Sequence, residues 1–359
     1  MKKKEKPVWD GPSIGGVTQS LLQKYLVCRE RFRLLVIEGW REQREFSHRM
    51  EYGTMFHLCE EYYNQNKNWE KALRDHCVAL GMRFAINRGE IEKWYRICKL
   101  QFPIYVKWWK DHPDVRNSKP IFHEEVFAVS LQLPESGRTV MVRGKFDGVD
   151  SIKKEVCLQE NKIKGDINEE QIKDELPFNL QTQVYCVALK GLGYSPGSVR
   201  YNVIRRPLSD WRGKFNISQR KGRKTKLGIV GAESTDDFHR RLGQLIVDNG
   251  AHFFMRWRLP VTNVDLDKFL AECLYPILEN LSDDYEWWSF AKEMGLSPFD
   301  MNSRTKYFRK HRARHYRMPF GVYNPLLEGR PGAYAEFLNT GSTRQLEQVT
   351  ELFPELNKE

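Results

Sequence analysis

The chain has 359 residues, of which 40% are hydrophobic and 29% charged, and its formal net charge at pH 7 is +11. This length is enough for one large or two ordinary domains with full cores. No apolar run approaches the length of a membrane span, which argues against an integral membrane protein. The first residues, Met-Lys-Lys-Lys-Glu-Lys-Pro, lack the apolar stretch of a signal peptide, and the seven cysteines form no Cys-x-x-Cys pair. We therefore expect a soluble cytoplasmic protein with buried, reduced thiols.

The positive charge is concentrated in two segments. Residues 200–226 contain ten Lys or Arg and one Asp, a net charge of +9. Residues 304–317 contain seven Lys or Arg and no acid, a net charge of +7. Together these segments carry more positive charge than the whole chain, which indicates a polyanionic partner better than the net charge does.

The first third of the chain is predicted to be helical. Residues 1–15 are expected to form a disordered basic lead-in. Thr18 or Ser20 can then cap a helix whose apolar residues extend to Leu35 at helical spacing. Residues 53–64 predict a second helix that carries His57 and Glu61 on one face. Residues 69–111 predict two or three more helices, rich in Trp and Tyr.

From Pro120 the pattern changes to strands. Residues 121–133, 139–152 and 155–163 alternate apolar and polar side chains and are separated by short polar turns. A polar loop over residues 164–175 leads to Pro177, which is well placed to start a helix that continues to Leu189. Residues 198–205 predict a fourth strand.

The rest of the chain is less regular. Residues 211–226 are polar and basic and predict a long mobile loop. Helices are expected at residues 235–249, 265–281 and 283–294. Residues 298–341, rich in Gly, Pro, Arg and aromatic side chains, predict irregular structure that wraps the core. No internal repeat and no Gly-x-x-x-x-Gly-Lys-Ser/Thr phosphate loop occurs, so nothing indicates an ATP-driven motor.

Three charged residues stand out in the predicted sheet. Asp147 lies on the second predicted strand, and Glu160 and Lys162 lie on the third, two residues apart and hence on the same face. Burying two carboxylates and an ammonium on one face is unfavourable unless something compensates their charge. A divalent cation held by hard oxygen ligands would do so. The pattern therefore predicts a metal site.

Other acids compete for the same role. Asp150 is the main rival of Asp147, although on a regular strand it points to the opposite face. Glu61 is either a partner of the site or an exposed helix acid, and the second is favoured. Glu125 can face the site from the first predicted strand.

The arrangement resembles the PD-(D/E)XK nuclease superfamily and, within it, the RecB-type exonuclease branch. The resemblance covers residues 18–206 and depends on four motifs in order. They are Gly53-Thr-Met-Phe-His57-Leu-Cys-Glu-Glu61, Gly144-Lys-Phe-Asp147, Glu160-Asn-Lys162 and Gln181-Thr-Gln-Val-Tyr185. It implies an α/β (α+β) fold with an αβββαβ restriction-endonuclease-like core. An N-terminal helical region (16–115), the core (116–206) and a helical or irregular C-terminal extension (207–359) are expected.

The resemblance also implies roles for these residues. Asp147, Glu160 and His57 would bind Mg²⁺ or Mn²⁺, and Lys162 would orient or deprotonate the attacking water. Gln181 and Tyr185 would hydrogen-bond the scissile phosphate or its neighbours. Some relatives carry an iron–sulfur cluster held by one cysteine before the core and three after it. Here only Cys28 and Cys273 are at suitable positions, so no iron–sulfur cluster is expected.

The two basic segments are the predicted contacts to the DNA backbone. Tyr307, Phe308 and Tyr316 lie among the arginines of the second segment, a mixture suited to stacking on single-stranded bases. The predicted contacts are Arg205, Arg206, Arg212, Lys214, Arg220, Lys221, Arg223, Lys224, Lys226, Arg309, Lys310, Arg312 and Arg314.

The predicted function is therefore a metal-dependent DNA nuclease, a RecB-like exonuclease of recombination, repair or phage DNA processing in a bacterial cytoplasm. It would act alone or beside a separate helicase or single-strand annealing protein. Two alternatives stay open: a structure- or sequence-specific endonuclease, and a catalytically silent nucleic-acid-binding protein on the same fold.

Overall fold

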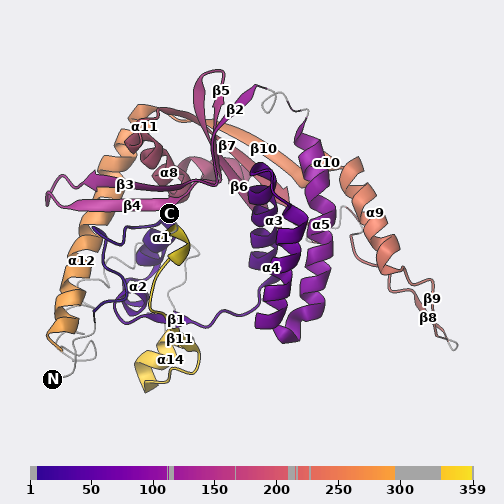
Figure 1. Ribbon diagram of the computed structural model, residues 1–359, viewed down its shortest axis with the longest axis horizontal. Helices are drawn as coiled ribbons and strands as arrows, with labels where there is room; N and C mark the ends of the chain where they lie inside the picture. Colours follow the sequence, from indigo (N-terminus) through magenta and orange to yellow (C-terminus); the bar gives the residue numbers. More distant parts are fainter. Residues whose placement is uncertain are drawn as a thin grey trace.

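The computed structural model describes residues 6–110, 112, 117–165, 167–208, 215, 217–225, 228–295 and 333–357. Its elements form an arch with a β-sheet at the top (Figure 1). Helices α1, α2 and α12 lie on one side of the arch and α3, α4 and α5 on the other, and residues 43–47 connect the two sides below. None of the described helices is both long enough and apolar enough to cross a membrane.

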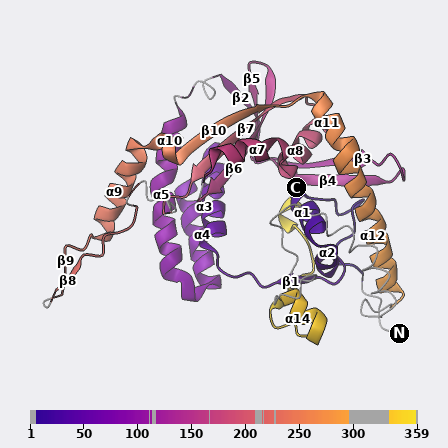
Figure 2. The ribbon, with the colours of Figure 1, turned by 180° about the vertical axis from the view of Figure 1, so that it is seen from behind.

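A five-stranded mixed sheet forms the centre of the fold, in the order β10-β7-β6-β5-β2. Strands β6 and β7 are parallel, and the other pairs are antiparallel. The crossover between β6 and β7 contains α7 and α8, which lie beside these strands in the view from behind (Figure 2). The bounds are β2 Ser118–His123, β5 Gly148–Ile152, β6 Glu155–Lys164, β7 Pro196–Arg205, β10 Phe254–Pro260, α7 Glu169–Glu175 and α8 Leu180–Gly191. This mixed α/β architecture confirms the expected fold class.

Strands β3 (Val126–Gln132) and β4 (Thr139–Lys145) form a separate antiparallel hairpin. The chain passes between the central sheet and this hairpin at two bends. The first is at Glu124, whose φ of 52° is in the left-handed region, and the second is at Phe146 and Asp147. The two bends hydrogen-bond each other, from Phe146 N to Glu125 O at 2.9 Å and from Glu124 N to Asp147 O at 3.4 Å. They therefore hold Asp147 in a fixed place between the two sheets.

The helices on one side of the arch share the larger core with α8 and the β3–β4 hairpin. They are α1 (Gln19–Val27), α2 (Arg29–Val36) and α12 (Tyr275–Glu293), the last preceded by α11 (Asn263–Phe269) and a π-helical stretch over Leu270–Leu274. Trp9 is buried in this core, with its ring edge-to-face against Phe32 and Tyr285. The expected disorder of residues 1–15 is therefore wrong from residue 6 onward, because Trp9 anchors this segment.

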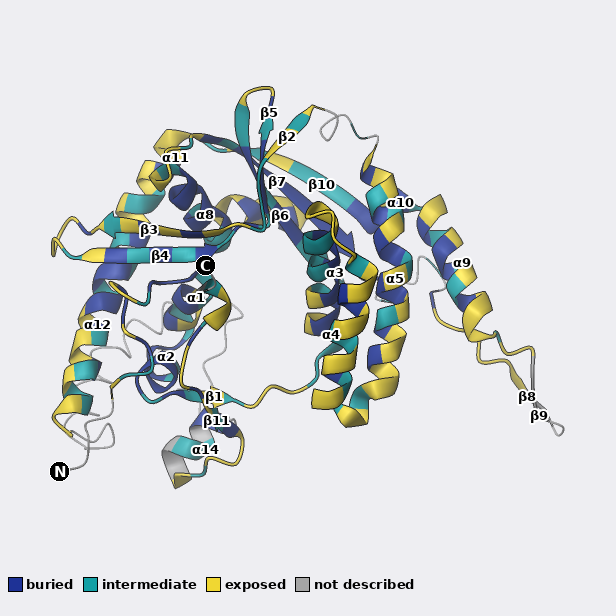
Figure 3. Cartoon of the chain, in the orientation of Figure 1, coloured by how far each residue is buried: buried dark blue, intermediate teal, exposed yellow. Residues whose placement is uncertain are grey.

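The helices on the other side form a second core around Phe102 and Phe253. They are α3 (His48–Asn64), α4 (Trp69–Arg83), α5 (Arg88–Lys110), α9 (Thr235–Asp248) and the short α10 (Gly250–Phe253). Figure 3 shows β7 buried and the outward faces of α4, α5 and α9 exposed. The two cores do not follow the expected boundary at residue 115, because α1 and α2 belong to one and α3–α5 to the other.

Short elements complete the described part. Strand β1 (Trp40–Glu42) pairs with β11 (Leu346–Gln348), next to α14 (Ala333–Thr340). Strands β8 (Arg223–Thr225) and β9 (Gly228–Val230) form a hairpin that projects beyond α9 in Figure 1. Single helical turns occupy Ala85–Asn87, Leu176–Phe178 and Pro354–Asn357. The predicted loop over residues 211–226 thus contains a strand of this hairpin.

Several predicted boundaries differ from the structure. The first predicted helix is two helices, because Cys28 is extended and its sulfur accepts a hydrogen bond from Arg31 N as the cap of α2. Asn179 caps α8, which therefore starts at Leu180 rather than at Pro177, and α7 occupies part of the expected polar loop. The two helices expected over residues 265–294 are continuous through the π-helical stretch. Strand β10 was not predicted, and most of the expected irregular tail (298–341) lies outside the described residues.

Candidate active site

Strand β6 carries the first two predicted site residues on the face that α8 covers. The carboxylate of Glu160 is fully buried, and Lys162 Nζ lies 2.9 Å from its Oε2. Lys162 Nζ also donates a hydrogen bond to Gln181 Oε1 on α8 at 2.8 Å. The structure therefore brings together Glu160, Lys162 and Gln181, as the sequence predicts.

Asp147 reaches the same strand from the bend between β4 and β5. Its Oδ2 accepts a hydrogen bond from the backbone N–H of Asn161 at 2.9 Å. The pairing of β5 with β6 ends at Gly148 and Gln159. The backbone N–H of Asn161 lies beyond this last pair, where β5 no longer runs beside β6. Asp147 thus lies beside the backbone that separates Glu160 from Lys162.

The electrostatics of these side chains are interdependent. Burial raises the pKa of Glu160 to about 7, an effect that the nearby Lys162 opposes and the charge of Asp147 reinforces. Burial lowers the pKa of Lys162, but the carboxylates of Glu160 and Asp147 outweigh it and the net shift is upward. Lys162 is therefore a cation held between two carboxylates.

His57 and Glu60 approach the group from α3. The ring Nδ1 of His57 lies 3.5 Å from Glu60 Oε2. The side chain of His57 is 36% exposed. Burial of the ring nevertheless lowers its pKa, and the charge of Lys162 lowers it further, whereas the charge of Asp147 opposes the shift. The neutral imidazole is the form that binds metals. Burial and the charge of Asp147 raise the pKa of Glu60 well above its usual range.

A second charged group borders the first. Lys145 Nζ lies 2.8 Å from Glu124 Oε2 and 3.1 Å from Glu61 Oε2, which joins β4 to α3. Burial raises the pKa of Glu124 to about 7, with Lys145 opposing and Asp147 reinforcing the shift. Glu61 is therefore a half-buried ion-pair partner rather than a freely exposed acid. The acid that faces the site from the bend after β2 is Glu124, and not the predicted Glu125.

Asp150 is paired elsewhere. Its carboxylate binds the guanidinium of Arg200 and the hydroxyl of Ser118 on the neighbouring strands. Both Asp150 and Arg200 are buried. Asp150 is therefore a structural ion-pair partner on the opposite sheet face, and Asp147 is the carboxylate next to Glu160.

Tyr185 lies on α8 one turn after Gln181, against the aromatic side chains of the hairpin and its bend. Its ring is edge-to-face with Phe127 and Phe146, at centroid distances of 5.3 and 5.6 Å. Burial raises the pKa of its hydroxyl, with the charges of Glu160 and Asp147 adding to the shift, whereas a hydrogen bond with Gln181 lowers it. Tyr185 therefore packs with its ring and places its hydroxyl near the charged group.

Gly144 makes room for these rings. A Cβ at this position would lie 2.9 Å from Phe127 Cζ and 3.3 Å from Tyr185 Cε1. We expect Gly144→Ala to lower the free energy of unfolding by about 1–3 kcal/mol, because overpacking displaces the rings. The matched control is Gly53→Ala on α3, where a Cβ meets no atom within 4 Å and alanine favours the helix. Urea unfolding compares them, and equal stability of the two variants would contradict the packing role of Gly144.

The predicted metal ligands are near one another but not preformed as a set. In the described part of the chain, no three His, Cys, Asp or Glu side chains are arranged to hold an ion. Instead Asp147 binds the Asn161 N–H, and His57 lies beside Glu60. The donor chemistry nevertheless fits a divalent cation, because both buried oxygens of Glu160 lack a partner with hydrogen-bond geometry. Side-chain rotation at His57 and Asp147 would be needed to share one ion.

Glu60, Glu124, Lys145 and Asn161 contribute to the site although the sequence did not single them out. Glu60 and Glu61 both share a helical face with His57, at spacings of three and four, so spacing alone does not choose between them. Lys145 and Glu124 become recognisable only when the two bends bring β2 and β4 together. Asn161 acts through its backbone, which no side-chain motif reveals.

Of the predicted DNA contacts, two are buried in the structure and three are exposed. Arg205 is buried and donates to the backbone carbonyls of His252 and Gly165. Arg206 is buried with its guanidinium over the ring of Trp94. The prediction that Arg205 and Arg206 contact DNA is wrong, because their side chains are buried. Arg220, Lys221 and Arg223 are exposed. The side chains of Arg212, Lys214, Lys224, Lys226, Arg309, Lys310, Arg312 and Arg314 lie outside the described residues.

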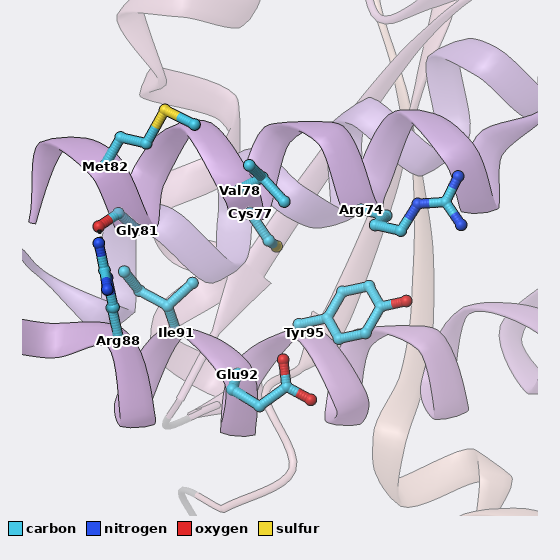
Figure 4. Close-up of a pocket in the computed structure, with 9 residues that line it drawn as sticks. All are labelled: Arg74, Cys77, Val78, Gly81, Met82, Arg88, Ile91, Glu92 and Tyr95. Carbon is cyan, nitrogen blue, oxygen red and sulfur yellow. Dashed lines mark hydrogen bonds between the residues drawn. The ribbon is translucent and has the colours of Figure 1, made fainter. Parts of the chain in front are cut away.

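Two hollows lie beside the helices of the second core. One, of about 780 Å³ between α5 and α9, is lined by Lys93, Arg96, Arg220 and Lys221. The other, of about 400 Å³ between α4 and α5, has a mainly apolar wall that includes Val78, Met82 and Ile91 (Figure 4). None of the predicted catalytic residues lines the second hollow, and burial raises the pKa of its Cys77 thiol to about 12.

Comparison with known proteins agrees with this geometry. A search of curated protein sequences found no match to the chain. The family model of the PD-(D/E)XK nuclease superfamily matches residues 17–273, which include α3, the β-strands around Asp147 and Glu160, and α8. With most of its length matched, and with Asp147, Glu160 and Lys162 gathered at one strand, the chain belongs to the PD-(D/E)XK nuclease superfamily.

Proposed function

We propose that this protein is a divalent-metal-dependent deoxyribonuclease, a RecB-like exonuclease that removes nucleotides from DNA ends. The observation that carries the proposal is the buried Glu160 in contact with Lys162, with Asp147 beside the same strand and His57 nearby on α3. The carboxylate of Glu160 is fully buried, and apart from its ion pair with Lys162 its oxygens have no partner with hydrogen-bond geometry among the described residues. A divalent cation would supply the missing partner.

Each residue of the site has a proposed role. Asp147, Glu160 and His57 would hold Mg²⁺ or Mn²⁺, which, when bound, offsets the negative charge on the phosphate and favours deprotonation of water. Lys162 is held by Glu160 and Gln181 at the position where an ammonium can orient the attacking water and stabilise the charge that develops on the phosphate. Gln181 accepts a hydrogen bond from Lys162 Nζ and so would help to fix its position, and the Tyr185 hydroxyl lies near the same group.

The test is digestion of linear, circular, single-stranded and double-stranded DNA in Mg²⁺, Mn²⁺ and EDTA. We expect metal-dependent loss of linear DNA from its ends, with closed circles left intact. Cleavage of circles would instead indicate an endonuclease. Binding to DNA without cleavage in either metal would indicate a catalytically silent protein on the same fold.

We also propose the cellular setting that the sequence predicts. The protein would act on DNA in a bacterial cytoplasm, as a cellular or phage-encoded protein of recombination, repair or DNA processing. A separate helicase or single-strand annealing protein would supply or use its single-stranded DNA.

The exposed cations beside α5 and α9 are the proposed path of the DNA backbone. Arg220 and Lys221 share a hollow with Lys93 and Arg96, and Arg223 follows them on the projecting hairpin. Replacing Arg220, Lys221 and Arg223 together with alanine should weaken DNA binding regardless of sequence. The slope of log affinity against log salt should become shallower by roughly 0.7–0.9 for each lost phosphate contact.

Fluorescence anisotropy at several salt concentrations in Ca²⁺ measures this effect. The control removes the same charge elsewhere, at Lys71, Lys190 and Lys268, each on a different helix. If both triple variants change affinity and salt slope equally, the charged loop is not a specific DNA contact.

A further inference from the structure

A pocket of about 330 Å³ lies between the central sheet and helices α3 and α5. Because side chains alternate along a strand, its floor residues Gln159 and Asn161 point away from the face that carries Glu160 and Lys162. Its volume is near the lower end for small-ligand sites, which run from about 300 to 1,000 Å³. None of the proposed metal ligands or catalytic residues lines this pocket.

The wall of the pocket is suited to an anion. Arg200, Arg256 and Lys110 line it, and the carboxylate of Asp150 is already bound to Arg200 and Ser118. Only 2% of the Arg200 surface is exposed, and its Nε and Nη1 have no hydrogen-bond partner among the described residues. Buried guanidinium donors without acceptors are unfavourable, and a phosphate supplies such acceptors in the planar geometry that arginine matches.

The same pocket also offers groups that suit a nucleoside. The amides of Gln159, Asn161 and Asn202 provide both donors and acceptors, as the edge of a base requires. At the rim, 46% of the Tyr63 surface is exposed, which leaves an aromatic ring on which a base can stack. The guanidinium of Arg256 lies 3.7 Å from the centre of the Trp109 ring, which fixes its plane.

A chain of contacts connects this pocket to the catalytic residues. Arg256 Nε donates to Asn202 Oδ1 at 2.5 Å, and Asn202 Nδ2 donates to Asn161 Oδ1 at 2.6 Å. The backbone N–H of Asn161 in turn donates to Asp147. Glu60, which also lines the pocket, lies beside His57. A ligand in the pocket would therefore lie on the opposite face of β6 from Glu160 and Lys162, connected to Asp147 through Asn161 and to His57 through Glu60.

We propose that this pocket binds a phosphate-bearing terminal nucleotide of a DNA strand and so holds the end of the substrate across β6 from the catalytic residues. The proposal rests on the proposed nuclease function. It adds a substrate class: DNA whose end carries a phosphate. Arg200 and Arg256 bind that phosphate, and the three amides and Tyr63 contact its nucleoside.

The test compares linear duplexes that differ only in having a phosphate or a hydroxyl at the 5′ or the 3′ end. A phosphate at one of the two ends should raise kcat/KM about tenfold or more, since charge-assisted hydrogen bonds to arginine are strong. In Arg256→Gln this ratio should fall towards one. Arg258→Gln is the matched control, because Arg258 lies two residues along β10, pairs with Glu155 and does not line the pocket. It should keep the ratio of the unmodified protein.

Binding of free ligands is measured separately, in EDTA, by calorimetry and thermal shift. Thymidine 5′-monophosphate should bind and raise the Tm, inorganic phosphate should bind more weakly, and thymidine should not bind. Equal rates on phosphorylated and hydroxyl ends together with no binding of the monophosphate would overturn the proposal. Binding of the monophosphate by a protein that cleaves no DNA would support the pocket and refute the nuclease function.

Discussion

Replacing Lys162 with alanine is expected to lower the rate of DNA cleavage by about 10²–10³-fold, the usual effect of removing one charge-stabilising group from an active site. The ammonium of Lys162 lies between Glu160 and Gln181, and in the proposed reaction it would stabilise the negative charge that develops on the phosphate during attack. It acts mainly in the transition state, so DNA affinity measured in Ca²⁺ should stay within a few-fold. Single-turnover cleavage and anisotropy measure the two quantities.

Lys190→Ala is the matched control for this variant. Lys190 pairs with Asp267 and lies near the end of α8, nine residues after Gln181. It should leave cleavage unchanged. If Lys162→Ala cleaved DNA at the normal rate, Lys162 would have no part in the mechanism, and the catalytically silent alternative would gain weight.

Replacing Asp284 with alanine should lower the free energy of unfolding by about 3–5 kcal/mol, as expected when one member of a buried ion pair is removed. Asp284 Oδ2 on α12 accepts hydrogen bonds from Tyr25 at 2.7 Å and from Arg29 at 2.9 Å. Both carboxylate and guanidinium are largely buried, at 8% and 11% side-chain exposure. The variant would leave the Arg29 charge in the core without the carboxylate that neutralises it.

The neighbouring residue supplies the control. Asp283 pairs with Arg138 at the surface, where 61% of its side chain is exposed. Surface pairs contribute about 0–1 kcal/mol, so Asp283→Ala should change stability little. Urea unfolding of the two variants gives the comparison. Equal losses would mean that the Asp284 pair does not connect α12 to the first two helices in the way the structure indicates.

The order of the elements could be predicted from the sequence, but the breaks within the strands could not. Two long predicted strands, residues 121–133 and 139–152, are each divided between two sheets. The alternation of buried and exposed side chains continues through the second bend, so the pattern gives no sign of it, and at the first bend it is interrupted only by the polar residues His123, Glu124 and Glu125. Only the left-handed φ of Glu124 and the hydrogen bonds between the bends fix the break, and both depend on tertiary structure.

Strand β10 was missed by the sequence analysis for a different reason. Met255, Trp257 and Leu259 alternate with Arg256 and Arg258, which is a strand pattern that was overlooked between two predicted helices. Its partner on the sheet is β7, some fifty residues earlier in the chain. The pattern was present, but the pairing partner could not be inferred from it.

The candidate site was easier to predict than its surroundings. Glu160 and Lys162 follow from their spacing along one strand and Gln181 from the resemblance to the nuclease superfamily, and the structure places them in contact. Arg205 and Arg206 were assigned to DNA because they belong to the segment in which positive charge is concentrated. The structure encloses both, since β7 carries them into the second core beside Ile204. Charge along a sequence does not distinguish a solvated run from the end of a buried strand.

The contact of α12 with the first two helices has a consequence for the order of folding on the ribosome. Tyr25 and Arg29 meet Asp284 across more than 250 residues, and β1 pairs with β11 across about 300. Contacts of such long separation form late, because the intervening chain must be closed into a loop first. The part of the α1 and α2 surface that α12 covers, which includes Phe32, therefore remains exposed during synthesis until the buried Trp288 that packs on it has emerged. The α3–α5 hairpins, whose contacts are local, can fold long before, so we expect nascent chains halted near residue 250 to protect α3–α5 from proteolysis but not α1 and α2.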